Sequence, residues 1–118
     1  MQKATIQTRL PSLNEYIDAC RANKYTAAKM KRNAEYEISL FIRKLKRVES
    51  PVYITFTWRE KDKRRDPDNV AFAKKFIFDA LVTRKILPND NARYVKGFRD
   101  DFEYGKDYSV TIQMEEIL

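Results

Sequence analysis

The sequence predicts a single α+β domain spanning residues 1–118, with helices packed on one side of a mixed sheet in a two-layer β-α-β-α-β-β order. Its 118 residues, 43% of them hydrophobic, suit one compact core and leave no room for a second domain of ordinary size. Apolar residues recur at every second position in some segments and at every third or fourth position in others, as in strands and helices. No internal repeat, low-complexity tract or linker interrupts these segments.

The N-terminal part of the chain predicts a strand followed by a long helix. Residues 4–10 alternate apolar and polar side chains up to Pro11, which predicts a strand, and residues 11–16 predict a loop or a short helical turn. Residues 25–48 carry apolar side chains three or four positions apart, which predicts a helix that ends before Pro51. The opposite face of this helix is basic, and it fits a solvated surface and a DNA-tracking surface equally well.

The remaining elements are predicted to be a strand, a helix and a hairpin. Residues 52–58 alternate and are rich in β-branched and aromatic side chains, which predicts a strand. Residues 67–84 show helical periodicity, and Phe72, Phe76 and Phe78 widen the apolar stripe. After a turn at residues 87–91, the segments 94–102 and 108–114 predict a hairpin closed around residues 103–107.

The balance of charged residues indicates a polyanionic partner. The chain has 24 Lys and Arg against 17 Asp and Glu, a net charge of +7, and a pI of about 9.5. The basic residues gather at 29–32, 43–47 and 61–65 instead of being scattered evenly. This clustering favours nucleic acid as the partner, although charge alone would also suit an ordinary soluble surface.

Several kinds of chemistry are excluded by composition. The sequence has no histidine, only Cys20 as a thiol and only two glycines. Imidazole bases, zinc sites, disulfides within the chain, phosphate loops and dinucleotide fingerprints are therefore not expected, nor is a small-molecule cofactor. No apolar segment approaches the roughly 20 residues that span a bilayer, and no secretion signal is seen, so we expect a cytoplasmic protein without a membrane partner.

Carboxylates, lysines, hydroxyls or a metal held by oxygen remain as candidates for chemistry, and two carboxylates stand at the start of the second predicted helix. In Asp66-Pro67-Asp68-Asn69, an ordinary structural role is a good alternative, because Asp followed by Pro favours a helix start. The preceding Lys63-Arg64-Arg65 and the later Asp90 are not needed for capping. Closely spaced aspartates also suit Mg²⁺, which is usually held by one or two carboxylates and substrate phosphate. Asp90 could complete such a site only if its turn folds back beside Asp66.

At these residues the chain resembles the RusA family of Holliday-junction resolvases, which are small homodimeric nucleases often carried by bacteriophages and prophages. The resemblance covers most of the chain and rests on four ordered segments: residues 64–69, Lys75 with Asp79-Ala80-Leu81, Asn89-Asp90, and the loop of residues 11–17. It implies a metal site of Asp66, Asp68 and Asp90 for Mg²⁺, with Mn²⁺ as an alternative ion. It also implies an active-site lysine, for which Lys75 matches when counted back from Asp79 and Lys74 remains an alternative.

The expected function is metal-assisted hydrolysis of branched DNA, in particular of four-way junctions, in recombination or repair inside a bacterial cell. Lys63, Arg64 and Arg65 are expected to contact phosphates, together with Lys74 and with Asn14 from the early loop. Cutting two symmetry-related strands requires a twofold dimer, so we expect a homodimer. Two alternatives stay open: a non-catalytic basic DNA-binding dimer, and a nuclease that acts on flaps or forks.

Overall fold

A computed structural model describes residues 1–117 of the chain, and Leu118 lies outside the described residues. The elements follow one another in the order β1, α1, α2, β2, α3, α4, β3 and β4. The strands span Gln2–Ile6 (β1), Val52–Glu60 (β2), Val95–Tyr104 (β3) and Ser109–Glu116 (β4). The helices span Leu13–Ala22 (α1), Lys24–Phe41 (α2), Pro67–Ala71 (α3) and Lys74–Thr83 (α4).

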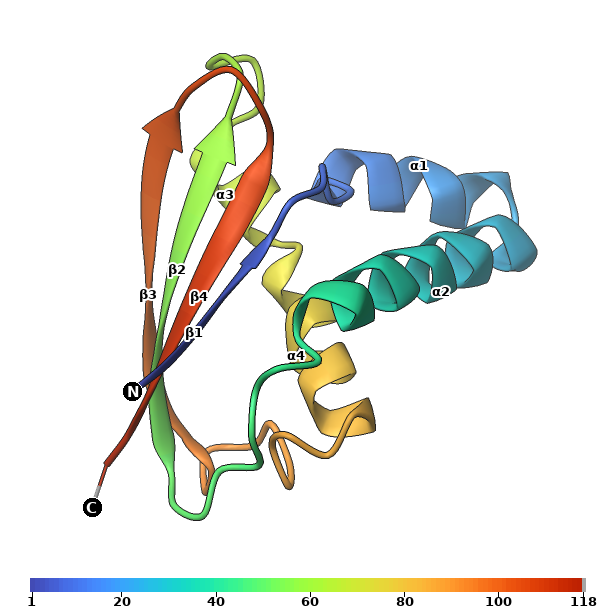
Figure 1. The fold of residues 1–118 in the computed structure, drawn as a ribbon. Coiled ribbons are helices and arrows are strands. Elements are labelled where there is room, and N and C mark those ends of the chain that lie inside the picture. The colour runs from blue at the N-terminus through green and yellow to red at the C-terminus, as the bar shows by residue number, and fades with distance from the viewer. Residues whose placement is uncertain (118) are drawn as a thin grey trace.

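The strands form one mixed sheet in the order β1-β4-β2-β3. β2 pairs in parallel with β3 and antiparallel with β4, and β1 pairs antiparallel with β4. The helices lie on one face of this sheet, and the α1–α2 pair projects away from it (Figure 1). The predicted α+β class, the mixed sheet and the one-sided helical layer are confirmed.

The core lies between β2 and the helices. Ile54 and Phe56 of β2 are fully buried, and Ile38 of α2 and Leu81 of α4 are fully buried with them in the same cluster. The intervening residues of β2 are more exposed, because successive strand residues point to opposite faces of the sheet. The alternation in this strand therefore identified the central core strand correctly. No helix within residues 1–117 is long and apolar enough to cross a membrane.

β2, α3, α4 and β3 form a crossover unit, which decides where the candidate residues lie. Because β2 and β3 are parallel, with Val52 beside Val95 and Glu60 beside Tyr104, the chain must return across the sheet between them. The helices α3 and α4 make this return, so α3 starts near the end of β2 and the segment after α4 leads to the start of β3 (Figure 1). The beginning and end of the helical segment thus lie toward opposite ends of the sheet.

The predicted hairpin between the last two strands is wrong. β2 lies between β3 and β4, so these two strands do not pair with each other, although only residues 105–108 connect them. The physical reason is that β2, the most apolar strand, gains most by pairing on both sides in the middle of the sheet. The short connection crosses the end of β2, where the amide of Gly105 donates a hydrogen bond to the Glu60 carbonyl (3.0 Å).

The N-terminal segment also differs from the prediction. The first strand ends at Ile6 instead of continuing to residue 10, and the predicted turn at residues 11–16 is the start of the ten-residue helix α1. Ser12 and Glu15 form a reciprocal capping box, in which the Ser12 Oγ accepts from the Glu15 amide and a Glu15 carboxylate oxygen accepts from the Ser12 amide. This Ser-x-x-Glu signal was present in the sequence and marks the helix start.

Both predicted long helices are shorter than expected. α2 ends at Phe41, yet Ile42, Leu45 and Val48 stay buried in an irregular segment, because the apolar period reports burial and not helical hydrogen bonding. The second helix is interrupted between α3 and α4, where the amides of residues 73, 75 and 76 donate to carbonyls three positions back. Across the break, Phe72 and Phe76 both contact the Tyr16 ring of α1, at centroid distances of 5.5 and 5.8 Å.

Candidate metal and nucleic-acid site

Asp66 and Asp68 lie at the start of α3 and both are exposed. Asp66 occupies the N-cap position, but its side chain makes no capping hydrogen bond. Asp68 accepts a hydrogen bond from the adjacent Asn69 amide (3.0 Å), and among residues 1–117 neither carboxylate takes part in an ion pair. Helix capping by hydrogen bonding therefore does not account for Asp66, and both carboxylates have oxygens free to bind a cation.

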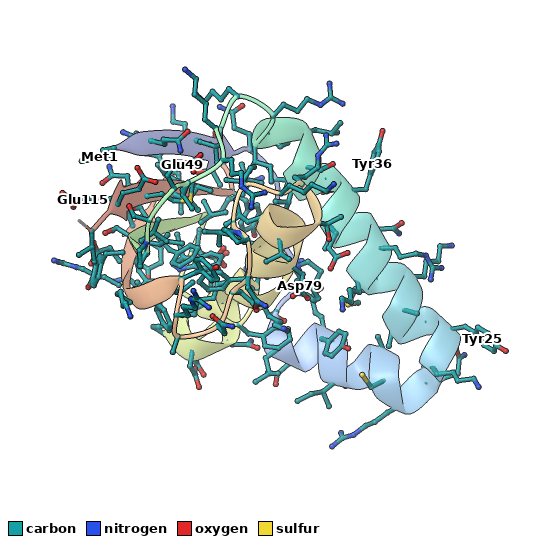
Figure 2. All side chains as sticks on the ribbon, turned by 90° about the horizontal axis from the view of Figure 1, so that it is seen from below. Met1, Tyr25, Tyr36, Glu49, Asp79 and Glu115 are labelled. Carbon is teal, nitrogen blue, oxygen red and sulfur yellow. The ribbon has the colours of Figure 1, made fainter. Side chains whose placement is uncertain are left out.

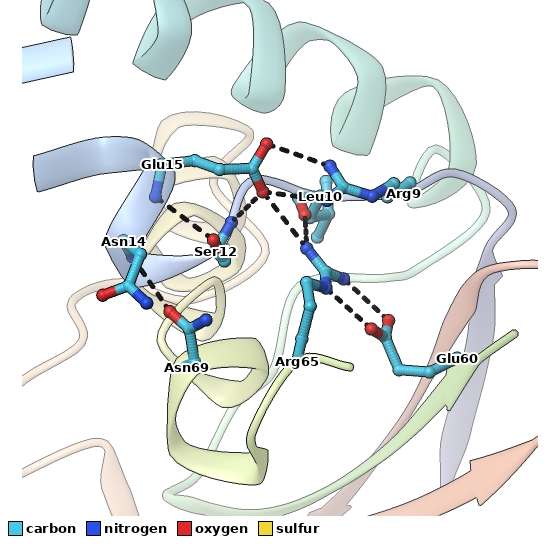
Figure 3. Close-up of polar contacts among 8 residues, drawn as sticks. All are labelled: Arg9, Leu10, Ser12, Asn14, Glu15, Glu60, Arg65 and Asn69. Atoms are coloured by element: carbon cyan, nitrogen blue, oxygen red, sulfur yellow. Dashed lines mark hydrogen bonds and ion pairs between the residues drawn. The ribbon is translucent and has the colours of Figure 1, made fainter. Parts of the chain in front are cut away.

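Arg65, directly before this pair, is held inside the protein. Its Nε and Nη2 donate to the two carboxylate oxygens of Glu60 at 2.7 Å each, and its Nη1 donates to the Leu10 carbonyl at 3.0 Å (Figure 3). The Arg65 side chain is only 14% exposed and that of Glu60 only 7%. These contacts give Arg65 a structural role, and a phosphate contact, which stays a prediction, would have to break this buried pair.

Lys63 and Arg64, in contrast, lie on the surface near the ends of β2 and β3. The Arg64 side chain is 89% exposed and has only an exposed contact with Asp62, at 3.5 Å. Lys63 lies over the ring of Tyr104, with Nζ 5.4 Å from the ring centroid. Both side chains are thus accessible from solvent, and their contact with phosphates stays a prediction.

The surface near the ends of β2 and β3, which we call the rim, also carries Tyr104 and Tyr108. The sequence interpretation did not single out these two tyrosines. Tyr104 is 46% exposed beside Lys63, and Lys61 Nζ lies 5.3 Å from the centroid of Tyr108. Basic and aromatic side chains that alternate on a surface are typical of nucleic-acid contacts, because phosphates and bases can each find a partner. The signal could not be found in the sequence, since Tyr104 comes near Lys63 through the parallel pairing of β3 with β2, and Tyr108 comes near Lys61 where residues 105–108 cross the end of β2.

Asn14 lies next to the Asp68 segment, as its predicted role requires. Its backbone amide donates to the Asn69 side-chain oxygen (2.9 Å), so the start of α1 is tied to the start of α3 (Figure 3). The Asn14 side chain itself is exposed. The early loop and the aspartate pair are thus brought together from positions 55 residues apart.

Lys75 lies in a charged cluster between α4 and the turn that carries Asp90. Lys75 Nζ donates to Asp79 Oδ1 (3.2 Å) and lies 4.0 Å from Asp90 Oδ2. The hydrogen bond and charge of Asp79, with a smaller contribution from Asp90, raise the pKa of Lys75 above its ordinary value. Lys31 of α2 lies 3.4 Å from Asp79 Oδ2, but this buried oxygen has no hydrogen-bond partner among the described residues.

Lys74 is the less suitable of the two candidate lysines. It pairs with Asp100 of β3, whose other oxygen accepts from the indole of Trp58 (3.0 Å), and its Nζ lies 4.4 Å from the centroid of Phe98. The Lys74 side chain is 19% exposed, whereas that of Lys75 is 61% exposed. Lys74 therefore braces α4 against the sheet, and Lys75 is the lysine that a substrate can reach.

The three aspartates do not converge in this structure. Residues 1–117 contain no group of three or more Asp, Glu, Cys or His side chains placed to hold a metal ion. Asp66 and Asp68 precede the crossover helices whereas Asp90 follows them, and Asp90 lies beside Lys75. A three-carboxylate site does not fit this arrangement. Asp66 and Asp68 alone still match the one or two carboxylates that Mg²⁺ usually takes from a protein.

No protein-family model and no curated protein sequence matches this chain.

Proposed function

We propose that this chain is a metal-dependent endonuclease of the RusA type that cuts branched DNA, with four-way junctions as its substrate. The observation that carries the proposal is the pair of exposed carboxylates of Asp66 and Asp68, which form no ion pair within residues 1–117 and follow directly after the basic residues 63–65. An enzyme with this role would work in the cytoplasm of a bacterial cell, and the resemblance suggests a phage or prophage origin.

The proposed cofactor is Mg²⁺, with Mn²⁺ as an alternative, and Asp66 and Asp68 would hold it. When bound, such an ion activates a water molecule and neutralises charge on the phosphate. A role for Asp90 as a third ligand would require the turn at residues 88–91 to release Lys75. Without histidine in the chain, no imidazole can compete for the role of base.

The protein's own side chains would bind and orient the DNA. Lys63 and Arg64 would contact phosphates on either side of the cleaved bond, which positions the substrate without reading its sequence. Lys75, an exposed cation whose pKa is raised by Asp79, stays protonated at neutral pH and would stabilise negative charge on the phosphate.

A homodimer is part of the proposal, since a junction is resolved by cuts in two symmetry-related strands. The Phe-rich second helix is a poor interface, because Phe76 and Phe78 are buried in the chain's own core. The free edge of β3, a ten-residue strand with the exposed ring of Phe98, is the better surface. Sedimentation that finds only monomer at micromolar concentration, with and without junction DNA, would contradict paired cutting.

The test is cleavage of a synthetic four-way junction in Mg²⁺ and in EDTA. We expect Asp68→Asn and Asp66→Asn to abolish cleavage and to retain junction binding, because they remove ligand charge without removing a phosphate contact. Asp18→Asn is the matched control, since Asp18 is an exposed aspartate of α1 that forms no ion pair within residues 1–117, and it should cleave like the wild type.

Two rival functions give different results in the same assay. A non-catalytic DNA-binding dimer would bind the junction and leave it intact in Mg²⁺ at every enzyme concentration. A nuclease for flaps or forks would cut those substrates faster than junctions of equal arm length. Full activity of Asp68→Asn would refute the assignment of the site.

A further inference from the structure

A groove between α2 and α4 is lined by residues that play no part in the proposed cleavage site. It encloses about 470 Å³ and lies on the helical layer, away from the rim that carries Lys63 and Arg64. Its lining comprises Arg32, Glu35, Tyr36, Ser39, Arg43, Ala80, Thr83 and Arg84.

The three arginines of this groove have no protein partner within residues 1–117. All three are exposed, and none of them forms an ion pair, whereas Arg9, Arg59 and Arg65 all do. The lining of the groove carries three arginines and a single carboxylate, that of Glu35. A planar guanidinium group matches two phosphate oxygens at once, so the groove is complementary to a phosphodiester chain.

Tyr36 adds an aromatic surface to these charges. Its side chain is 66% exposed and extends outward from α2 (Figure 2). A flat ring among arginines can stack with a nucleobase, and such stacking is sequence-tolerant because every base has a flat face. Paired bases in a duplex interior offer no free face, so this feature favours a single strand.

The groove is lined by residues of α2 and α4 that are close in sequence to the contacts of the candidate active-site lysine. Asp79 lies where α4 faces α2, and it contacts both Lys31 and Lys75 (Figure 2). Glu35 and Ala80, which line the groove, are close neighbours in sequence of Lys31 and Asp79 on the same two helices. A strand lying in the groove would therefore pass beside the corner formed by Lys75 and Asp90.

We propose that this groove binds a single-stranded segment of DNA, with its phosphates on Arg32, Arg43 and Arg84 and a base stacked on Tyr36. The inference rests on the proposed function only in the choice of nucleic acid as the polyanion. Branched DNA exposes unpaired nucleotides where its arms meet, and the groove would hold one such strand near the site of cutting.

The contribution of the three arginines to DNA binding is tested by the fluorescence anisotropy of a fluorescein-labelled oligothymidine. The binding is measured in EDTA over a range of salt concentrations. We expect the triple variant R32A/R43A/R84A to bind at least tenfold more weakly, with a log-log salt slope smaller by about 2, from about 0.7 per lost contact on a single strand. The control K3A/R21A/K24A removes the same charge from exposed sites outside the groove and should keep the wild-type slope. Equal losses in both variants, or none in the groove variant, would overturn the proposal.

The aromatic contact is tested by comparing Tyr36→Ala with Tyr36→Phe on the oligothymidine and on a duplex of the same length. Loss of one stacked base should weaken single-strand binding by roughly tenfold in the Ala variant, while the Phe variant and duplex binding change little. Equal weakening on both DNAs, or no weakening, would overturn the single-strand assignment. If the triple alanine variant does not fold, the single variant Arg84→Glu replaces it and should weaken binding in the same direction.

These outcomes are separable from those of the cleavage test. Binding in EDTA does not depend on the metal, so a groove variant that binds normally removes this inference and leaves the nuclease assignment intact. If the groove binds single-stranded DNA but the protein never cuts a junction, the inference about the groove stands and the nuclease assignment is refuted.

Discussion

Arg65 and Glu60 form a buried, two-pronged ion pair in which both carboxylate oxygens accept hydrogen bonds of 2.7 Å from one guanidinium group. The pair joins the end of β2 to the residue before Asp66. Through the contacts of Arg65 with the Leu10 carbonyl and with Glu15 (3.4 Å), it also joins the start of α1. This network sets the position from which the candidate aspartates leave the sheet.

Removal of Arg65 should therefore destabilise the fold. Arg65→Ala leaves the Glu60 carboxylate buried and unpaired, which we expect to lower the free energy of unfolding by about 3–5 kcal/mol. Arg65→Lys should recover only part of this loss, because an ammonium group cannot make the two parallel bonds. Urea denaturation measures the change. Arg64→Ala is the control, since its side chain is 89% exposed and the loss should stay within about 0.5 kcal/mol.

Substitutions of the adjacent Lys74 and Lys75 should have different effects, the first on stability and the second on cleavage. Lys74→Ala removes the partner of the half-buried Asp100 and should cost about 2 kcal/mol of unfolding free energy, since hydrogen bonds to charged groups contribute about 1.5–3 kcal/mol. Lys75→Ala should change stability by less than about 0.5 kcal/mol, as its ion pair with Asp79 is exposed on the lysine side. Junction cleavage should be lost in the Lys75 variant. Retained cleavage there, with loss confined to a folded Lys74 variant, would reverse the assignment.

Asp79 should control the protonation of Lys75. Asp79 is the main cause of the raised pKa of Lys75, first through its hydrogen bond and then through its charge. Asp79→Asn should therefore bring that pKa down toward 10.5, so that Lys75 loses its proton at lower pH than in the wild type. The NMR titration of the Lys75 Cε resonance measures this shift. A Lys75 pKa that is unchanged in the variant would show that the contact is absent in solution.

Glu15 should contribute to acid sensitivity. Partial burial raises its pKa, but hydrogen bonds from Arg9 and Ser12 outweigh this effect and lower the pKa from 4.5 to about 2. Because the folded protein holds Glu15 more acidic than the unfolded chain does, its stabilising effect is present above pH 4.5 and is lost as the pH falls toward 2. The melting temperatures of wild type and Glu15→Gln should differ above that range and converge below it. Glu115→Gln, at an exposed position, should keep the acid dependence of the wild type.

Features decided by neighbouring residues could be predicted from the sequence. The alternation of β2 identified the core strand, and the Asp-Pro pair identified the start of α3. The absence of histidine restricts the possible chemistry by composition alone. The capping box of Ser12 and Glu15 was equally local and could have revealed α1.

Only the tertiary structure decided which distant residues meet. The place of β2 between β3 and β4, the capture of Arg65 by Glu60 and Leu10, and the pairing of Lys74 with Asp100 all depend on packing between separate elements. The same holds for Asp90, which the crossover carries away from Asp66 and toward Lys75. Local patterns report the burial and backbone preference of a segment. Strand order and side-chain partners instead follow from how the whole apolar surface is buried, to which every element contributes.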